Sequence, residues 1–326
     1  MGSVVRKRLG IAAACATLIA AAFPAVGLAQ SSGYPQRKIT FIVGFAPGGG
    51  IDVFTRIVAQ ELGGQFGYQI VVENRPGSAS NIAAQVVATS PPDGYTFLVT
   101  GNSLAINQTM SKDLTYSIGQ LRAVAFPARD SHALAVNADS KAHSLAEFIA
   151  LAKGKPVSAA VGGSSSHIVA DYVLKVKAGL QEASVPFQSG QPAMNALLGH
   201  QVDILAGPVS EVFAQLKAGR VRALAVSGPQ RALALPDVPT LTQSGFPGLE
   251  ISGWIGLLAP AKTPTDICAK LNIAINTLVD KPSFNARLRN LGYEPATMAL
   301  KDTDEFLSRS IATWRRMIVA TGLAPQ

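Results

Sequence analysis

The sequence of 326 residues contains only two cysteines, Cys15 and Cys268, and only four histidines. Cys15 lies in an apolar N-terminal segment that we expect to be removed. Its loss would leave Cys268 alone and exclude an intrachain disulfide. We expect Cys268 to be a small core residue on a helix. The histidines are dispersed without the spacing of metal ligands, so we expect no metal site.

Charged residues are also few, at 15% of the chain, whereas hydrophobic residues make up 48%. This balance excludes a disordered polymer and allows sizeable packed cores. The formal net charge is +8, but three of the basic residues, Arg6, Lys7 and Arg8, lie in the N-terminal segment. The other basic residues are scattered and form no stripe with interleaved aromatics. We therefore expect no nucleic-acid partner.

The N-terminal segment has the layout of a signal peptide. Its three basic residues precede a short apolar run at 9–22, Pro24 ends that run, and Gly27 and Ala29 supply small residues before a cleavage site. A membrane anchor needs about 20 apolar residues, which is longer than this run. Lipidation at Cys15 is the alternative, but only six residues of apolar run precede it. We predict that residues 1–29 are a signal peptide, cleaved near Ala29, and that the mature protein is periplasmic.

Short apolar runs alternate with helical patterns along the rest of the chain, as in parallel α/β sheets. In a first unit, strands are predicted at 39–45, 69–73 and 96–100, with helices around 54–62 and at 81–89. In a second unit, strands are predicted at 132–137, 157–162, 183–187, 202–206 and 222–227, with helices at 144–153, 167–177, 192–198 and 209–218. The sequence therefore predicts an α/β protein with two units.

The last third of the chain begins with a proline-rich and glycine-rich loop at 228–250. A strand is then predicted at 254–258, followed by helices from about 264, at 283–290 and at 304–319. These helices have no sheet of their own, so we expect them to pack on the first unit. The prediction is a first lobe of residues 30–131 and 255–326 and a second lobe of residues 132–254. Two crossover segments would form the hinge.

Two helix starts carry specific signals. Pro264 is predicted to occupy the first helical position, with Asp266 in the positive first turn of that helix. Ser144 and Glu147 have the spacing of a capping box. In this motif the serine side chain accepts from the Glu147 amide, and the glutamate side chain accepts from the Ser144 amide.

A glycine-rich loop, PGGGID at 47–52, lies between the first predicted strand and its helix. Glycines let a ligand approach the backbone closely, and free amides at a helix start carry a partial positive charge. The loop is therefore a candidate anion site, with a simple tight turn as the alternative. It lacks the lysine of a phosphate-binding loop and the spacing of a dinucleotide site. We expect Asp52 mainly to stabilise the helix dipole.

Further polar loops follow the other predicted strands. Residues 73–81 and 100–103 follow parallel strands, so they fall at the same sheet edge as the glycine-rich loop. Ligands of open parallel sheets bind at this edge, where the strands have their carboxyl ends. Arg75 could pair with a ligand carboxylate or with Glu73. Residues 162–167 and 188–191 repeat the arrangement in the second unit. Two anion-receptive edges, one for each lobe, are what a ligand clamp needs.

Three serines at 164–166, with His167 and Asp171, raise the possibility of a hydrolase. A nucleophilic serine needs a base within hydrogen-bond reach and an oxyanion hole. Neighbouring serine and histidine residues on one turn rarely face each other, and no Gly-x-Ser-x-Gly elbow is present. We therefore predict that the protein is not an enzyme, and a hydrolase using the Ser164–His167 loop remains the alternative.

Seven ordered motifs give the chain a family resemblance from about Tyr34 to its C-terminus. They are PQRKIT (35–40), FAPGGGID (45–52), VENRPG (72–77), PDGYT (92–96), VPFQSG (185–190), LPDVPT (235–240) and WIGLLAP (254–260). With these motifs the chain resembles the Bug-type extracytoplasmic receptors of tripartite tricarboxylate transporters.

The resemblance implies a type 2 periplasmic-binding-protein fold that closes like a Venus flytrap. Each lobe would be a mainly parallel sheet flanked by helices. The ligand would be a small carboxylate, either a di- or tricarboxylate or an aromatic acid, delivered to membrane permease subunits. No cofactor is implied, and we expect a monomer. A sensory receptor that feeds a two-component system is the alternative.

The resemblance and the positions of the polar loops together give the candidate ligand contacts, and the resemblance itself points to 46–50, 78–81, Asn102 and Ser103. In the first lobe they are Ala46, Pro47, Gly48, Gly49, Gly50, Asp52, Ser78, Ala79, Ser80, Asn81, Thr100, Asn102 and Ser103. In the second lobe they are Gly163, Ser164, Ser165, His167 and Gln188. The second lobe departs from the family pattern, because Phe187 and Gln188 replace a common Tyr-Lys pair and Ala206 and Gly207 stand where an acid or amide is frequent. These losses disfavour amino-acid ligands such as aspartate.

Overall fold

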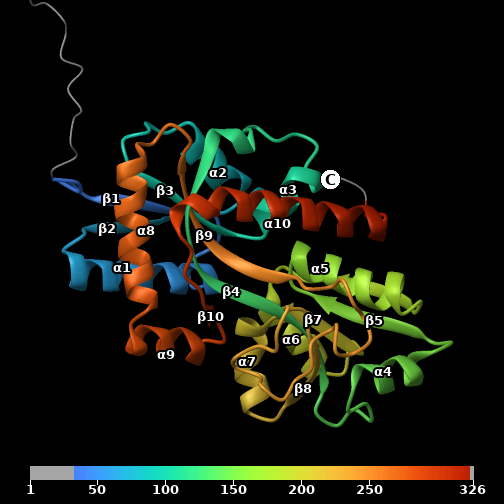
Figure 1. Cartoon of the computed structure of the whole chain (residues 1–326). Coiled ribbons are helices and arrows are strands. Elements are labelled where there is room, and N and C mark those ends of the chain that lie inside the picture. The colour runs from blue at the N-terminus through green and yellow to red at the C-terminus, as the bar shows by residue number, and fades with distance from the viewer. Residues whose placement is uncertain (1–32, 324–326) are drawn as a thin grey trace, which may run out of the picture. The chain divides into compact units, whose positions relative to one another are not determined.

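One strand of 17 residues, β4 (Leu121–Asn137), takes part in two β-sheets and organises the fold (Figure 1). The computed structural model describes residues 33–323. The first part of β4 pairs with β9 (Ser252–Pro260) in the first sheet, and the last part pairs with β7 (Ile204–Pro208) in the second. Only the end of this strand, residues 132–137, was predicted. The strand begins eleven residues earlier, and Pro127 and a polar run at 129–132 hide its pattern.

The first sheet has a parallel centre and antiparallel additions. Strand β1 (Ile39–Val43) pairs in parallel with β2 (Ile70–Asn74) and with β3 (Thr96–Gly101). Strand β9 then joins β3 and β4 antiparallel, and the short β10 (Glu294–Pro295) pairs with β4. The strand order brings the carboxyl ends of β1 and β3, and the loops that follow them, side by side.

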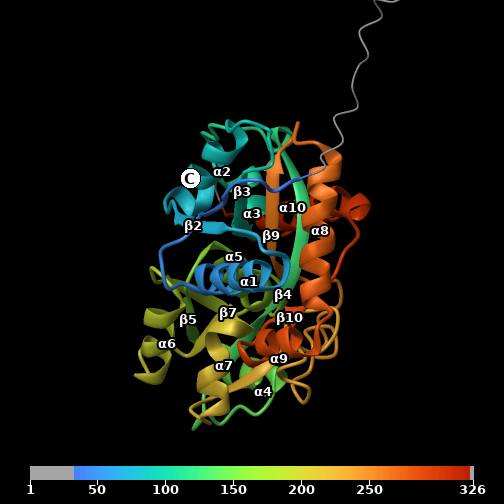
Figure 2. The ribbon, with the colours of Figure 1, turned by 90° about the vertical axis from the view of Figure 1, so that its left-hand side faces the viewer.

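Helices cover both faces of the first sheet, because side chains of a strand alternate between its faces. Phe41 and Val43 pack with helices α1 and α8, whereas Ile42 packs with α2 and α3 on the opposite face. Figure 2 shows α8 running beside β4. The helices around this sheet are α1 (Gly50–Phe66), α2 (Asn81–Ala88), α3 (Ser103–Met110), α8 (Thr265–Val279), α9 (Pro282–Asn290) and α10 (Leu300–Thr321). Cys268 is fully buried in the α1–α8 core, as predicted.

The second sheet repeats the mixed arrangement. Strand β5 (Pro156–Val161) pairs in parallel with β6 (Gln181–Pro186) and β7, while β8 (Val221–Val226) and β7 pair antiparallel with β4. Its helices are α4 (Leu145–Ala152), α5 (Ser164–Ala170), α6 (Gly190–Leu198) and α7 (Val209–Lys217). Helix α5 continues directly into a π-helical segment, Asp171–Lys177, where one uninterrupted helix was predicted.

Two predicted helix starts need correction. The Ser144 side chain accepts from the Glu147 amide, as expected, but the Glu147 carboxylate accepts from the amide of His143, at 2.8 Å, one residue before the expected donor. Pro264 is the N-cap of α8, so that Thr265 and not the proline is its first helical residue. Asp266 does lie in the first turn. In both cases the helix forms where predicted, and the error is one residue in the cap.

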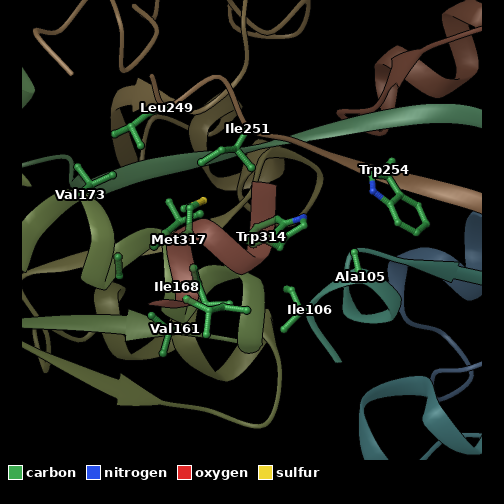
Figure 3. Close-up of a cluster of buried hydrophobic side chains, with 14 of the residues drawn as sticks. Ala105, Ile106, Val161, Ile168, Val173, Leu249, Ile251, Trp254, Trp314 and Met317 are labelled. Atoms are coloured by element: carbon green, nitrogen blue, oxygen red, sulfur yellow. The ribbon is translucent and has the colours of Figure 1, made fainter. Parts of the chain in front are cut away.

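Helix α10 packs more widely than expected. Helix α8 packs on the first sheet, as predicted, but α10 contacts α3 and β4 and also α5 and the π-helical segment of the second sheet. Figure 3 shows Trp314 and Met317 of α10 among side chains that include Ile168 of α5 and Val173 of the π-helical segment. A continuous apolar core therefore joins elements of the two sheets.

Three sequence predictions concern the signal peptide, membrane-spanning segments and the lobe boundaries. The predicted signal peptide lies outside the described residues. Within residues 33–323, no helix is both long and apolar enough to cross a membrane. The predicted lobe boundaries, at 131/132 and 254/255, fall inside the continuous strands β4 and β9. The division into two lobes at those residues stays a prediction.

Candidate functional site

Loops from both sheets line one cavity of about 490 Å³. From the first sheet come the loops that follow β1, β2 and β3. From the second sheet come the loops that follow β5 and β6 and the start of α7. Of the predicted contacts, the cavity is lined by Ala46, Gly49, Gly50, Ala79, Ser80, Asn102, Ser103, Gly163, Ser164, Ser165 and Gln188. The structure thus brings eleven of the predicted residues together.

The loop between β1 and α1 brings the N-terminal end of α1 to this cavity. Gly49 is the N-cap of α1, and the residues from Ala46 to Gly50 are exposed. The first amides of an α-helix have no acceptor within the helix, and the helix dipole makes this end positive. The α1 start can therefore receive an anion through its main chain alone.

Asp52 does not line the cavity but stabilises this loop through hydrogen bonds. Its carboxylate accepts from the Gly48 amide at 2.9 Å, from Asn74 Nδ2 at 2.9 Å and from Arg56 Nε at 3.0 Å. Burial alone would raise the pKa of Asp52, but the hydrogen bonds from Arg56, Gly48 and Asn74 outweigh it and hold that pKa below its usual range. Pro47 and Gly48 also lie outside the lining. Their role is to shape the loop.

The loop before α2 has an unusual backbone. Ser78, Ala79 and Ser80 all have positive φ values, of 45°, 50° and 78°. Such conformations are costly for residues with a Cβ and persist only where surrounding contacts hold them. Asn107 Nδ2 donates to the Ala79 carbonyl at 2.9 Å. Ser80 Oγ lies 2.9 Å from Thr100 Oγ1.

The third loop follows β3. Thr100 is fully buried, and its hydroxyl is occupied by Ser80, so it does not line the cavity. Asn102 does, and its side-chain oxygen accepts from the Trp254 amide at 3.2 Å. The hydroxyl oxygen of Ser103 is buried and has no hydrogen-bond partner among the described residues.

A second cavity, of about 500 Å³, adjoins the first and shares Ala79 and Ser164 with it. Three predicted contacts, Ser78, Asn81 and His167, line only this second cavity. His167 Nε2 lies 3.4 Å from Asp171 Oδ1 within the helix. Asn81 accepts from Asn107 at 2.7 Å and from Tyr116 at 3.2 Å.

His132 of β4 lines the first cavity and was not predicted to do so. It is 2% exposed, and its Nε2 lies 3.0 Å from Ser165 Oγ. Burial lowers the pKa of His132 to about 4, so the ring is neutral at neutral pH. Its Nδ1 has no partner among residues 33–323. The only available signal was its place on a predicted strand.

A cluster of acidic and hydroxyl groups at the cavity was also missed. Ser210 of α7 donates to Asp130 of β4 through its hydroxyl, at 2.5 Å, and through its amide, at 3.2 Å. The Tyr293 hydroxyl also hydrogen-bonds with Ser210, and it lies 2.8 Å from where a Cβ on Gly50 would stand. Burial raises the pKa of Asp130 to about 8 and that of Glu211 to about 7. In the sequence Asp130 lies in an apparent loop, and Glu211 reads as an ordinary first-turn acid.

No group of three or more potential metal ligands occurs within the described part of the chain.

The family model described as "Tripartite tricarboxylate transporter family receptor" matches residues 54–323. The chain belongs to this receptor family.

Solved structures of similar proteins agree with this assignment. A structure of the R. palustris protein Rpa4515 with adipate has a TM-score of 0.82 and 29% identity, covering 90% of this receptor and 100% of that chain. The periplasmic binding protein BugD has a TM-score of 0.78 and 27% identity, covering 90% and 100%. MatC from Rhodopseudomonas palustris with bound malate has a TM-score of 0.75 and 27% identity, covering 87% and 100%. The predicted Bug-type family and bilobal α/β periplasmic-binding-protein fold are confirmed.

The serine loop of this receptor does not assemble the hydrolase arrangement that was kept as the alternative. Ser165 pairs with His132 and not with His167, whereas His167 pairs with Asp171. A serine nucleophile needs one histidine that contacts both the serine and an acid. The two halves of that arrangement are thus on different histidines, and the low pKa of His132 makes it a weak base.

Proposed function

We propose that this receptor captures a small carboxylate in the periplasm and delivers it to the permease subunits of a tripartite tricarboxylate-type transporter. The observation that carries the proposal is the exposed α1 start, which lines the same cavity as the serine loop of the second sheet. Rpa4515 with adipate and MatC with malate support a carboxylate as the class of ligand. Aromatic acids belong to the same proposal.

In this proposal two lobes close around the ligand. The lobes are residues 30–131 with 255–326, and residues 132–254. Strands β4 and β9 are the crossovers. A ligand that contacts loops of both lobes binds the closed form more tightly and shifts the population toward it. The receptor acts as a monomer, uses no cofactor and catalyses no reaction. Residues 1–29 direct export and are removed near Ala29.

Gly49→Val tests the site. Gly49 has a φ of −70°, which any residue adopts, and a Cβ there would meet only the Ala46 carbonyl oxygen, at 3.3 Å. The variant should therefore fold, while its side chain occupies the space in front of the α1 amides. Loss of two charge-assisted hydrogen bonds would weaken binding by about 100-fold or more.

The measurement is calorimetry of the mature protein with the acid that gives the largest thermal shift in a screen of carboxylates. Gly64→Val, in the last turn of the same helix, is the matched control, because a Cβ there meets nothing within 4 Å. It should bind as the unmodified protein does. Equal affinity of the two variants would contradict the proposed site.

A further inference from the structure

The His132 side chain has one hydrogen-bond partner and one unpaired ring nitrogen. The residue stands where β4 begins to pair with the second sheet, and it is 2% exposed. Its ring packs edge-on against Trp314 of α10, with 6.3 Å between the ring centres. Its Nε2 lies 3.0 Å from Oγ of Ser165 at the start of α5, whereas its Nδ1 is buried without a partner among residues 33–323. The surroundings therefore fix the ring and give it a single polar contact.

The unpaired Nδ1 decides which ring nitrogen carries the hydrogen. A neutral imidazole has one N–H donor and one acceptor nitrogen. A hydrogen on Nδ1 would leave a buried N–H without an acceptor, and such orphaned donors are rarer in proteins than unpaired acceptors. A doubly protonated ring would leave the same N–H unpaired and would also bury a charge. The favoured form of His132 is therefore neutral, with its hydrogen on Nε2 and directed at Ser165.

This tautomer determines what the Ser165 hydroxyl offers. When His132 Nε2 donates to Ser165 Oγ, the one hydrogen of the hydroxyl is not used in that contact. The Ser165 side chain makes no other hydrogen bond within the described part of the chain, and it lines the first cavity. The hydroxyl can therefore donate to an acceptor in the cavity. In the opposite tautomer Nε2 would accept that hydrogen, and Ser165 would offer only lone pairs.

Neutral donors matter in this cavity because it has no basic side chain. No lysine or arginine is among the described residues that line it, whereas Asp130 and Glu211 are. An anionic group on the second-sheet side therefore depends on hydroxyl and amide donors. A hydroxyl that donates to a carboxylate makes a charge-assisted hydrogen bond, which is roughly twice as strong as a neutral one. A hydroxyl that a neighbour already orients loses less freedom when it binds.

We propose that His132 is a positioning residue that fixes Ser165 as a hydrogen-bond donor to an anionic oxygen of the ligand. The inference rests on the proposed function and adds to it a residue that lies in none of the seven family motifs. His132 acts through Ser165, so the two side chains form one unit. The strand that takes part in both sheets thereby sets the direction of a donor in the cavity.

The first experiment determines the tautomer of His132 in the ligand-free mature protein. Long-range ¹H–¹⁵N correlation spectra of labelled histidine rings distinguish the two neutral tautomers from each other and from the charged ring. The His132 signals are assigned by elimination, with His143, His167 and His200 each replaced by glutamine in turn, so that His132 itself is kept.

The spectra should show a hydrogen on Nε2 of His132 and none on Nδ1. This pattern should stay unchanged between about pH 6 and about pH 8, a range in which an unperturbed histidine titrates. The reason is that burial lowers the pKa of His132 to about 4. A hydrogen on Nδ1, or a charged ring within that range, would overturn the positioning role and leave the carboxylate receptor standing.

The second experiment is calorimetry with adipate, malate and benzoate. Ser165→Ala removes the donor and should weaken binding of the tightest of these acids by about tenfold. His132→Phe keeps a ring without a donor and should lower the same affinity by up to about tenfold. The double variant should bind as Ser165→Ala does, because His132 acts through Ser165. His132→Gln, whose amide can replace the Nε2 donor, should bind more tightly than His132→Phe.

Ser184→Ala is the matched control. Ser184 lies in β6 of the same sheet, its hydroxyl donates to Asp171 at 2.8 Å, and it lines neither cavity, so its replacement should leave the affinity unchanged. Unchanged affinity in Ser165→Ala, or a further loss in the double variant, would overturn the positioning role alone. Failure of all three acids to bind the unmodified protein would overturn the proposed function and this inference with it.

Discussion

Asn107 fixes the strained loop before α2, and Asn107→Ala should weaken both the fold and the binding of ligand. Asn107 is 3% exposed, and its Nδ2 donates to the Ala79 carbonyl oxygen at 2.9 Å and to Asn81 Oδ1 at 2.7 Å. Each intramolecular hydrogen bond contributes about 1 kcal/mol net, so the variant should lose about 2 kcal/mol in the free energy of unfolding. Urea denaturation measures this loss.

The effect on binding follows from the strain in the same loop. Three successive residues with positive φ cost about 1 kcal/mol each or more, so the observed conformation depends on the contacts that hold it. Removing about 2 kcal/mol of those contacts shifts the loop toward relaxed conformations by up to about 30-fold. The apparent affinity should fall by up to the same factor, because only the observed conformation presents Ala79 and Ser80 to the cavity.

Asn272→Ala is a matched control for this prediction. Asn272 is 4% exposed, and its Nδ2 also donates two hydrogen bonds, to the Val124 carbonyl at 2.7 Å and to the Met298 carbonyl at 3.0 Å. It lines neither cavity. Its replacement should cost similar stability and leave the affinity unchanged. If Asn107→Ala loses stability but binds as tightly as Asn272→Ala, the loop does not depend on its contacts and the reasoning is refuted.

Two further predictions concern β4 and α10. Trp314→Ala should lower the free energy of unfolding, measured by urea denaturation, by about 3–5 kcal/mol. The reason is that Trp314 is 1% exposed in the core that joins elements of both sheets. A loss below about 1 kcal/mol would contradict that packing. Without ligand, the melting temperature should fall less between about pH 5 and about pH 9 in Asp130→Asn than in the unmodified protein. Burial raises the pKa of Asp130 to about 8, so the stability held by the protonated carboxyl at low pH is lost as the pH rises through that value, whereas asparagine stays neutral. Equal slopes in melts of the two proteins would count against this assignment.

Periodicity predicted most of the helices and strands, because their apolar residues recur with the spacing that each structure requires. The loops at the carboxyl ends of β1 and β3 were predicted for the same reason, since parallel strands place those ends at one edge. The glycine-rich loop is readable from its composition alone. These features are local, so the sequence contains their signals.

The missed features depend on contacts between distant segments. Asp130 lies in the middle of β4, where polar residues and Pro127 resemble a loop and only pairing with β9 makes a strand. His132 begins the predicted strand at 132–137, but its strand position alone does not show that it lines the cavity. Tyr293 reaches the α1 start from the far end of the chain. The positive φ values at Ser78 to Ser80 could not be predicted, since none of these residues is a glycine. Contacts with Asn107 and Thr100 hold this conformation. None of these partners lies near in sequence.

The sequence contains two tryptophans, Trp254 and Trp314, and the apolar core that joins elements of both sheets contains both. Trp254 also lines the cavity, and its Nε1 donates to Ser310 of α10 at 2.8 Å. The ultraviolet emission of the folded protein therefore originates beside the cavity and in the core that joins the two sheets. A rearrangement there should change the tryptophan fluorescence, so no attached dye is needed. Replacing each tryptophan in turn shows which of the two reports the change.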